Sequence, residues 1–267
     1  MSNVGPVLDR KQILDGLRPS IIDYLGETEA AAGVSVIFHG VPAVLPARAL
    51  AHYDTDAKQA RIEVRPDWCD YDIAHEVCHL NTWLIQGFGT LKPRPGASQR
   101  AIGARLWIEN CVSDHVVTRQ LLDVRLGLRF CGEVIDAAFF SSCAEWALRM
   151  AREEPLDTCE PFDAWVFYLA RLVWAALLLE RHAEHLRPEQ SEAVERFRYW
   201  SRNTRPKETE QADKVLKLFR NYDVHTPKGH GAVMSGLVDL HGLGEDVRLR
   251  RFERLEDGTF DLVEPPR

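Results

Sequence analysis

The segment DYDIAHEVCHLNTW, at residues 70–83, constrains the fold of this chain more than any other stretch. Apolar residues recur at helical spacing in it and directly after it: Ile73, Val77, Leu80 and Leu84. This spacing predicts a helix over about residues 70–86, with one side packed against a core. His75 and His79 lie four residues apart and project from the opposite side of that helix. The segment therefore predicts a packed helix that carries a polar face.

The HExxH pattern at residues 75–79 contains the groups that a catalytic zinc site needs. Two histidines at positions i and i+4 can bind one Zn²⁺ ion, which takes nitrogen, oxygen or sulfur ligands in a tetrahedron. Glu76 lies on the same turn, where its carboxylate can take a proton from water that the metal has acidified. With 10 histidines in the chain, random placement gives this pattern about 0.03 times per chain. We therefore expect zinc ligands at His75 and His79 and a catalytic base at Glu76; the alternative is a solvated helix face.

A catalytic zinc ion keeps one position for water, so a third protein ligand must come from elsewhere in the chain. The segment RLWIENCVSDHVVTRQLL, residues 105–122, predicts a helix that offers Glu109, Asp114 and His115. Glu109 and Asp114 flank opposite sides of its apolar face, so periodicity does not choose between them. Asp114 could instead bind the distal nitrogen of a zinc-binding histidine and fix its orientation. The apolar neighbours of His115 favour a buried core histidine.

These two segments resemble those of the HExxH zinc metallopeptidases. HEVCH, followed about 30 residues later by an acidic helix, resembles the gluzincins, whose second helix supplies a Glu ligand; this resemblance implies Glu109. NCVSDHVVTRQL is similar to the second motif of predicted intracellular metallopeptidases associated with von Willebrand A domains, which implies Asp114. The chain departs from the gluzincin pattern, because alignment of its VSD places Asn110 where Glu belongs. The resemblance covers residues 70–122.

Charge and composition exclude several classes of partner. The formal net charge is −7 and the pI about 5.8, without a Lys/Arg cluster, so we do not expect nucleic acid as a partner. The richest apolar run, residues 165–180, is too short to span a membrane and contains Arg171, so we expect no membrane segment. The six cysteines form no CxxC pair, and the first residues lack a secretory signal pattern. We therefore expect reduced thiols and a cytoplasmic protein.

Hydrophobic periodicity predicts an α+β fold that is mainly helical. Residues 8–28 predict a helix interrupted or kinked at Pro19, and residues 34–66 predict a small β layer, with a hairpin at DTDAK, that packs on the HExxH helix. Further helices are expected at residues 98–124, 133–152, 162–186, 189–202 and 207–221. The tail DVRLRRFERLEDGTFDLVE predicts a C-terminal β-hairpin. We divide the chain into a peptidase-like core, residues 1–125, and a helical region, residues 126–267; a single compact unit is the alternative.

The sequence predicts a zinc-dependent metallopeptidase, a hydrolase in which the metal and Glu76 activate water against the peptide bonds of a protein or peptide. An exposed edge strand could hold the extended substrate by backbone hydrogen bonds, and ARIEV, residues 60–64, is the candidate. The loop HTPKGHG could bring His225 or His230 to the site, but we expect both to be solvated loop residues. Two alternatives remain: a non-proteolytic binding or regulatory protein that keeps the peptidase frame, and a zinc hydrolase of a non-peptide amide.

Overall fold

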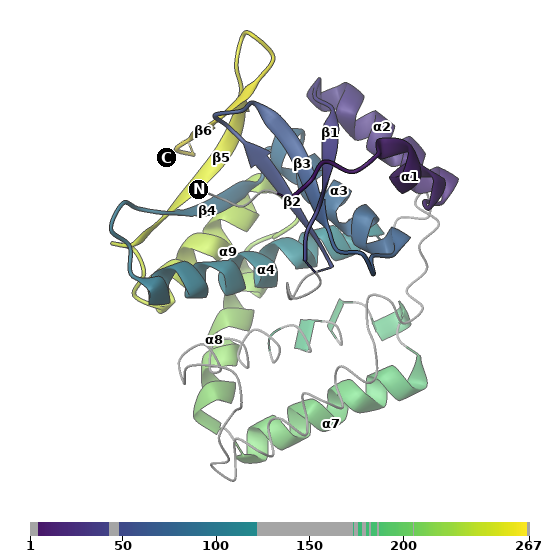
Figure 1. Ribbon diagram of the computed structural model, residues 1–267. Helices are drawn as coiled ribbons and strands as arrows, with labels where there is room; N and C mark the ends of the chain where they lie inside the picture. The colour runs from purple at the N-terminus through teal and green to yellow at the C-terminus, as the bar shows by residue number, and fades with distance from the viewer. Residues whose placement is uncertain are drawn as a thin grey trace. The chain divides into compact units, whose positions relative to one another are not determined.

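The computed structural model describes residues 5–42, 48–121, 173, 176–177, 180–181, 183–185, 187–204 and 206–265 (Figure 1). Helices and two small β-sheets make up this part of the chain, which confirms the predicted α+β fold. The helices predicted at residues 133–152 and, for the most part, 162–186 lie outside the described residues. Within the described ranges, no helix has the length and the apolar character needed to cross a membrane.

The N-terminal helix is interrupted at Pro19, as predicted, and forms two helices. Helix α1 spans Arg10–Asp15 and α2 spans Pro19–Ala32. The break occurs because the residue before a proline disfavours helical backbone, and Arg18 accordingly has an extended ψ of 145°. Gly33 ends α2 with a left-handed φ of 69°, a conformation that glycine adopts without strain.

A three-stranded sheet follows these helices. Its strands are β1 (Val36–Gly40), β2 (Ala49–Asp54) and β3 (Gln59–Val64), in the order β1-β3-β2. β2 and β3 form the antiparallel hairpin predicted around DTDAK, whereas β1 pairs with β3 in parallel. The prediction that ARIEV forms an edge strand is wrong, because β3 has a partner strand on each side. The edge strand on the hairpin side is β2.

The N-terminal segment covers the other edge of this sheet. The amide of Leu8 donates to the carbonyl of Phe38 at 2.9 Å, and the amide of Gly40 donates to the carbonyl of Pro6 at 2.9 Å. Val7 and His39 form the bridge between these two hydrogen bonds. Since β1 is covered in this way, β2 carries the open edge of the sheet among the residues that the structure describes.

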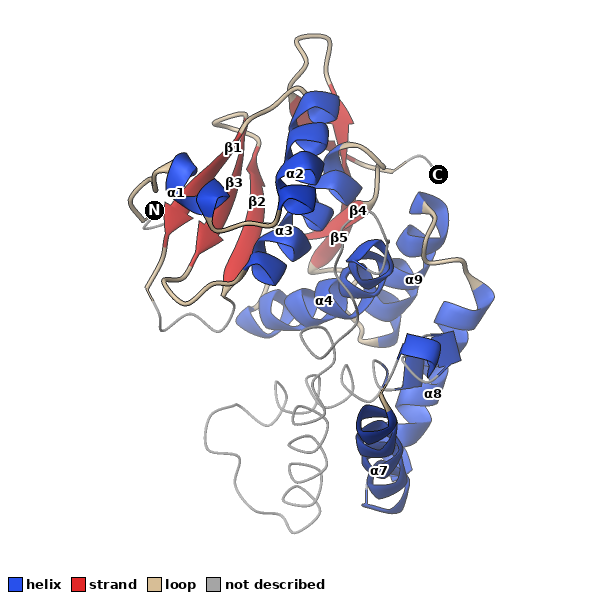
Figure 2. Cartoon of the chain, turned by 90° about the vertical axis from the view of Figure 1, so that its right-hand side faces the viewer, coloured by secondary structure: helices blue, strands red, loops and turns tan. Residues whose placement is uncertain are grey.

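The HExxH helix, α3 (Asp70–Leu84), packs on this sheet. It contacts β2 and β3, and α2 packs against it in turn, so that the two helices lie side by side next to the strands (Figure 2). The predicted packing of the β layer on the HExxH helix is thereby confirmed. Side chains from all these elements form one apolar cluster, whose largest fully buried members include Ile21, Leu25, Phe38, Ile62, Ile73 and Leu80.

A second three-stranded sheet contains β4 (Gly89–Pro93), β5 (Val247–Arg254) and β6 (Phe260–Val263), in the order β4-β5-β6. β5 and β6 pair in antiparallel fashion, which confirms the predicted C-terminal hairpin. The sequence did not predict β4, because glycine and proline cluster around it and indicate a loop. Its strand partner, β5, comes from the far end of the chain, so no local pattern announces the pairing.

The remaining described elements are helices α4 (Gln99–Leu121), α7 (Pro188–Thr204), α8 (Pro206–Asn221), α9 (Pro227–Leu240) and the 3-10 turn η2 (Ala183–His185). The first three overlap helices predicted from the sequence. Helix α9 begins inside HTPKGHG, residues 225–231, which the sequence predicts to be a loop, so this prediction is wrong from Pro227 onward. Thr226 caps the helix by accepting a hydrogen bond from the amide of Gly229 at 3.1 Å.

By their contacts, the described residues fall into two units. The first holds residues 5–90 without 43–47, residues 117–121 and residues 250–265; the second holds residues 91–116 and the described residues from 173 to 249. Helix α4 and strand β5 each run unbroken through the boundary. This division differs from the boundary expected near residue 125, because Phe252 and Phe260 of the C-terminal hairpin belong to the apolar cluster of the first unit.

Candidate metal centre

Helix α3 is held by polar contacts at its start and by apolar packing along its length. The amide of Cys69 donates to Oδ2 of Asp72 at 2.8 Å, and Nη2 of Arg18 donates to Oδ1 of Asp70 at 3.2 Å. The hydrogen-bonded guanidinium of Arg18 also lowers the pKa of the Asp70 carboxyl. The predicted apolar stripe is buried: Ile73, Val77, Leu80 and Leu84. The helix therefore presents its other face in a fixed orientation.

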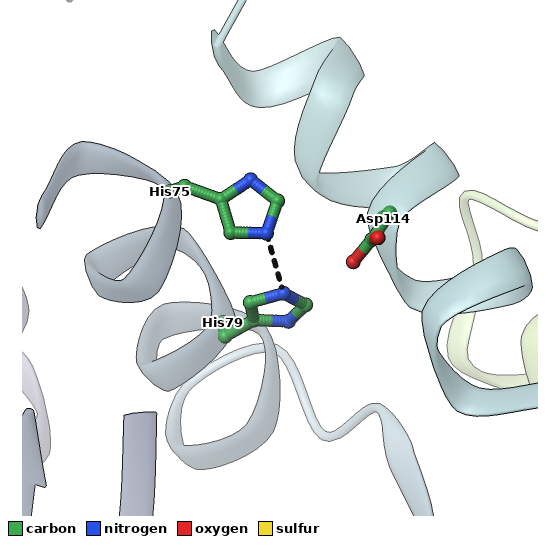
Figure 3. Close-up of side chains that lie close together, drawn as sticks. All are labelled: His75, His79 and Asp114. Atoms are coloured by element: carbon green, nitrogen blue, oxygen red, sulfur yellow. Dashed lines mark hydrogen bonds between the residues drawn. The ribbon is translucent and has the colours of Figure 1, made fainter. Parts of the chain in front are cut away.

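His75 and His79 direct their Nε2 atoms toward each other, 3.0 Å apart (Figure 3). Their ring centroids are 4.7 Å apart and the ring planes make an angle of 71°. Two Zn–N bonds at the tetrahedral angle place the nitrogens about 3.3 Å apart. The observed distance of 3.0 Å would have to open by only about 0.3 Å to accept the ion. The histidine pair therefore fits two ligand positions of one zinc ion.

Asp114, on α4, completes a group of three side chains that could hold a metal ion. One ligand atom from each of His75, His79 and Asp114 lies within 4.8 Å of the others, and the carboxylate faces the two rings (Figure 3). Zinc needs about 3.3 Å between ligands, so a carboxylate at the 4.8 Å limit must move by about 1.5 Å, which side-chain torsions can supply. Val117, one turn further along α4, packs in the same apolar cluster as α3. In the described part of the chain, no other such group of three or more occurs.

Glu109, the other acidic candidate on α4, is bound elsewhere. The amide of Leu91 in β4 donates to its Oε1 at 2.7 Å, and Nη1 of Arg105 donates to its Oε2 at 2.9 Å. The structure thus brings Asp114 to the histidine pair and holds Glu109 against β4. Close to Asp114, burial raises the pKa of the Cys111 thiol to about 12, and the carboxylate contributes to the rise. The group of converging side chains around Asp114 does not include Cys111.

Glu76 is buried and contacts the open edge of the first sheet. Its Oε2 accepts a hydrogen bond from the amide of Ala51 in β2 at 2.6 Å. Amides of an antiparallel edge strand point alternately toward the sheet and away from it, and that of Ala51 points away. No other hydrogen bond to Glu76 occurs within the described ranges. One carboxylate oxygen of Glu76 is thus fixed on β2, and the described residues provide no hydrogen bond to the other.

Two aromatic residues next to the histidines escaped the sequence analysis. The ring of Trp83 stacks on His79 with centroids 5.3 Å apart and planes at 29°, and the hydroxyl oxygen of Tyr71 lies 3.5 Å from Nδ1 of His75. Both residues could have been found, because each lies four positions from a histidine on the same helix row.

The three other histidines considered from the sequence lie in the second unit. His115 is fully buried, as the sequence favoured, and its Nε2 lies 3.1 Å from Nη1 of Arg181. Arginine can only donate, so Nε2 of His115 accepts and its ring is neutral. The interpretation of His230 as a solvated loop residue is wrong: it is 1% exposed on α9, with Nε2 3.4 Å from Oγ of Ser113. His225 is half-buried, with its ring centroid 5.3 Å from that of His115.

No protein-family model, curated protein or solved structure matches this chain.

Proposed function

We propose that the protein is a zinc-dependent metallopeptidase, with His75, His79 and Asp114 as metal ligands and Glu76 as the base. The observation that carries this proposal is the convergence of two imidazole nitrogens and one carboxylate beside an HExxH glutamate. Two histidines and one acidic residue are a common ligand set of catalytic zinc, because they leave a position for water. The free thiols of Cys69, Cys78 and Cys111 suit a reducing compartment, which supports a cytoplasmic location.

Glu76 supplies the acid–base chemistry in this proposal. A bound zinc ion lowers the pKa of water and polarises a carbonyl group. Glu76 accepts the proton of the attacking water on its unbound oxygen and delivers it to the leaving amine. The hydrogen bond from Ala51 at 2.6 Å keeps the carboxylate from rotating out of the site. General base action of this kind contributes about 10²–10⁴-fold to a rate.

The open edge of β2 supports an extended peptide as substrate. Alternation along the strand turns the amides and carbonyls of Ala49 and Tyr53 outward together with the carbonyl of Ala51, whose amide donates to Glu76. A peptide can add to such an edge through main-chain hydrogen bonds, which depend little on its side chains. Because Glu76 contacts the same edge, the peptide bond lies next to the base. This role passes from β3, which the sequence suggested, to β2.

The proposal is tested by measuring bound zinc and peptide cleavage on the full chain, with Glu76→Gln as the matched variant. Glutamine keeps an oxygen that can accept the Ala51 hydrogen bond but cannot take a proton. We expect about one zinc per chain in both proteins and a loss of turnover of about 10²–10⁴-fold in the variant. Equal turnover in the two proteins, or a chain that binds no zinc, refutes the proposal. Bound zinc without cleavage of any peptide in a library favours hydrolysis of a non-peptide amide.

A further inference from the structure

Four aromatic rings follow one another at every fourth residue of α3: Tyr71, His75, His79 and Trp83. Neighbouring ring centroids lie 6.0, 4.7 and 5.3 Å apart along this row. Residues four apart on a helix lie on one face, so the row follows from the spacing of the sequence. The two rings that carry the converging Nε2 atoms are the inner pair, and a larger ring stands at each end.

Trp83 makes the stacked ring contact of the row. Its plane lies at 29° to that of His79 with centroids 5.3 Å apart, so the two rings form an offset stack instead of meeting at an edge. Such a contact opposes rotation of the imidazole about its Cβ–Cγ bond, which would carry Nε2 away from the partner nitrogen. His79 is 8% exposed, and Trp83 therefore forms one wall of its enclosure.

Trp83 is itself held by the C-terminal hairpin. Its ring centroid lies 6.4 Å from that of Phe252 in β5, at an angle of 39°. Phe252 is buried and meets Tyr53 of β2 edge-on with centroids 5.5 Å apart, and Phe260 of β6 meets Tyr53 in the same geometry at 5.5 Å. A continuous set of aromatic contacts thus runs from the hairpin to the imidazole of His79.

Tyr71 contacts the other end of the row more weakly. Its hydroxyl oxygen lies 3.5 Å from Nδ1 of His75, at the outer limit of a hydrogen bond, and the rings meet at 53°. A histidine that binds metal through Nε2 carries its proton on Nδ1, which needs an acceptor. The Tyr71 oxygen is in place to accept it.

We infer that Trp83, held by Phe252, is a positioning residue that sets the affinity of the histidine pair for its metal, with Tyr71 in a lesser role. The inference rests on the metal site of the proposed function but not on peptidase activity. The inference also assigns a role to the C-terminal hairpin. The hairpin orients His79 through Trp83, although it contributes no metal ligand itself. Loss of an outer contact to a metal ligand lowers affinity by about 10–100-fold.

The dissociation constant for Zn²⁺, measured on the full chain by competition with a chelator, tests this inference. We expect Trp83→Leu to raise the constant by about 10–100-fold, Trp83→Phe by no more than about threefold, and Tyr71→Phe by less than Trp83→Leu. The matched control is Trp68→Leu, because Trp68 packs on the same apolar cluster but lies against Gly16. An unchanged constant in Trp83→Leu, or an equal loss in Trp68→Leu, overturns the inference.

A double-mutant cycle tests the part played by the hairpin. Phe252→Leu should weaken zinc binding several-fold when Trp83 is present and add nothing once Trp83→Leu is made, because its effect passes through the indole. Independent, additive losses contradict this path. Melting in chelator identifies any variant that no longer folds. If Trp83→Leu is one, Phe252→Leu carries the comparison with the parent, and an unchanged dissociation constant in it overturns the inference. If the parent binds no zinc, the metal site and this inference fall together; if it binds zinc without cleaving peptides, the inference stands alone.

Discussion

Zinc should stabilise the folded chain, and Asp114 should control by how much. A ligand that binds only the folded state at 100 times its dissociation constant adds about 2.7 kcal/mol of stability. For large domains each kcal/mol shifts the melting temperature by about 2–4 °C, so the shift for this chain should be about 5–11 °C. The histidine nitrogens need to separate by only about 0.3 Å from the observed 3.0 Å, and the Asp114 carboxylate, at the 4.8 Å limit, needs to move by about 1.5 Å through its side-chain torsions.

The variant Asp114→Asn removes the anionic ligand and preserves the shape of the side chain. If the zinc affinity of this variant is a hundredfold lower, the same concentration of free zinc equals the variant's dissociation constant. Zinc then adds only about 0.4 kcal/mol of stability, which shifts the melting temperature by about 1–2 °C. Differential scanning fluorimetry with buffered zinc, and with chelator as the reference, measures both values. Glu76→Gln should keep the full shift, because the proposed ligand set does not include Glu76. The reasoning fails if zinc does not move the melting temperature of the parent, or if Asp114→Asn shifts as far as the parent does.

Three substitutions test the scaffold by chemical unfolding. Gly26→Ala should stabilise the chain by about 0.5–1 kcal/mol, because alanine favours the helical backbone of α2 and its methyl group meets no neighbouring atom. Gly33→Ala should cost about 1–2 kcal/mol, because Gly33 has a left-handed φ of 69°. Equal effects of the two substitutions would contradict this reasoning. Arg18→Met should cost about 0.5–1 kcal/mol at pH 7. Because the pKa of Asp70 is lowered in the folded state, this loss of stability should fade as the pH falls below the ordinary Asp value of 3.8. A loss that persists in acid would show that Arg18 acts through packing instead of through its charge. Leu80→Ala, at a fully buried position, should cost about 2–5 kcal/mol, and a smaller loss would mean that α3 is not anchored there.

The elements that local patterns specify could be predicted from the sequence. The apolar stripe from Ile73 to Leu84 identified α3 and the side on which it packs, and the turn residues at DTDAK identified the β2–β3 hairpin. What failed depended on partners distant in the chain. The sequence predicts ARIEV as an edge strand, because no pattern in the neighbouring residues indicates that β1 pairs with β3 on its other side. Strand β4 was missed for the same reason.

The choice between Glu109 and Asp114 as the proposed third ligand shows the same limit at the level of single side chains. Helical periodicity left Glu109 and Asp114 equivalent, because a wheel describes one helix without its surroundings. What distinguishes them is the amide of Leu91 and the guanidinium of Arg105, which bind the carboxylate of Glu109. Of these two contacts, only the pair with Arg105, four residues earlier on the helix, could have been read from the sequence.

The short strip of chain at residues 6–8 makes strand addition to the first sheet one-sided. Residues 6–8 hydrogen-bond to the outward backbone groups of β1. Among the described strands of this sheet, a further strand can therefore add only at the edge of β2, which Glu76 contacts. A peptide and a strand from a second copy of the protein would then compete for the same edge of this sheet, the edge of β2. Deletion of residues 6–8 would expose a second edge, on β1, where further copies of the chain could pair strand to strand into ribbons.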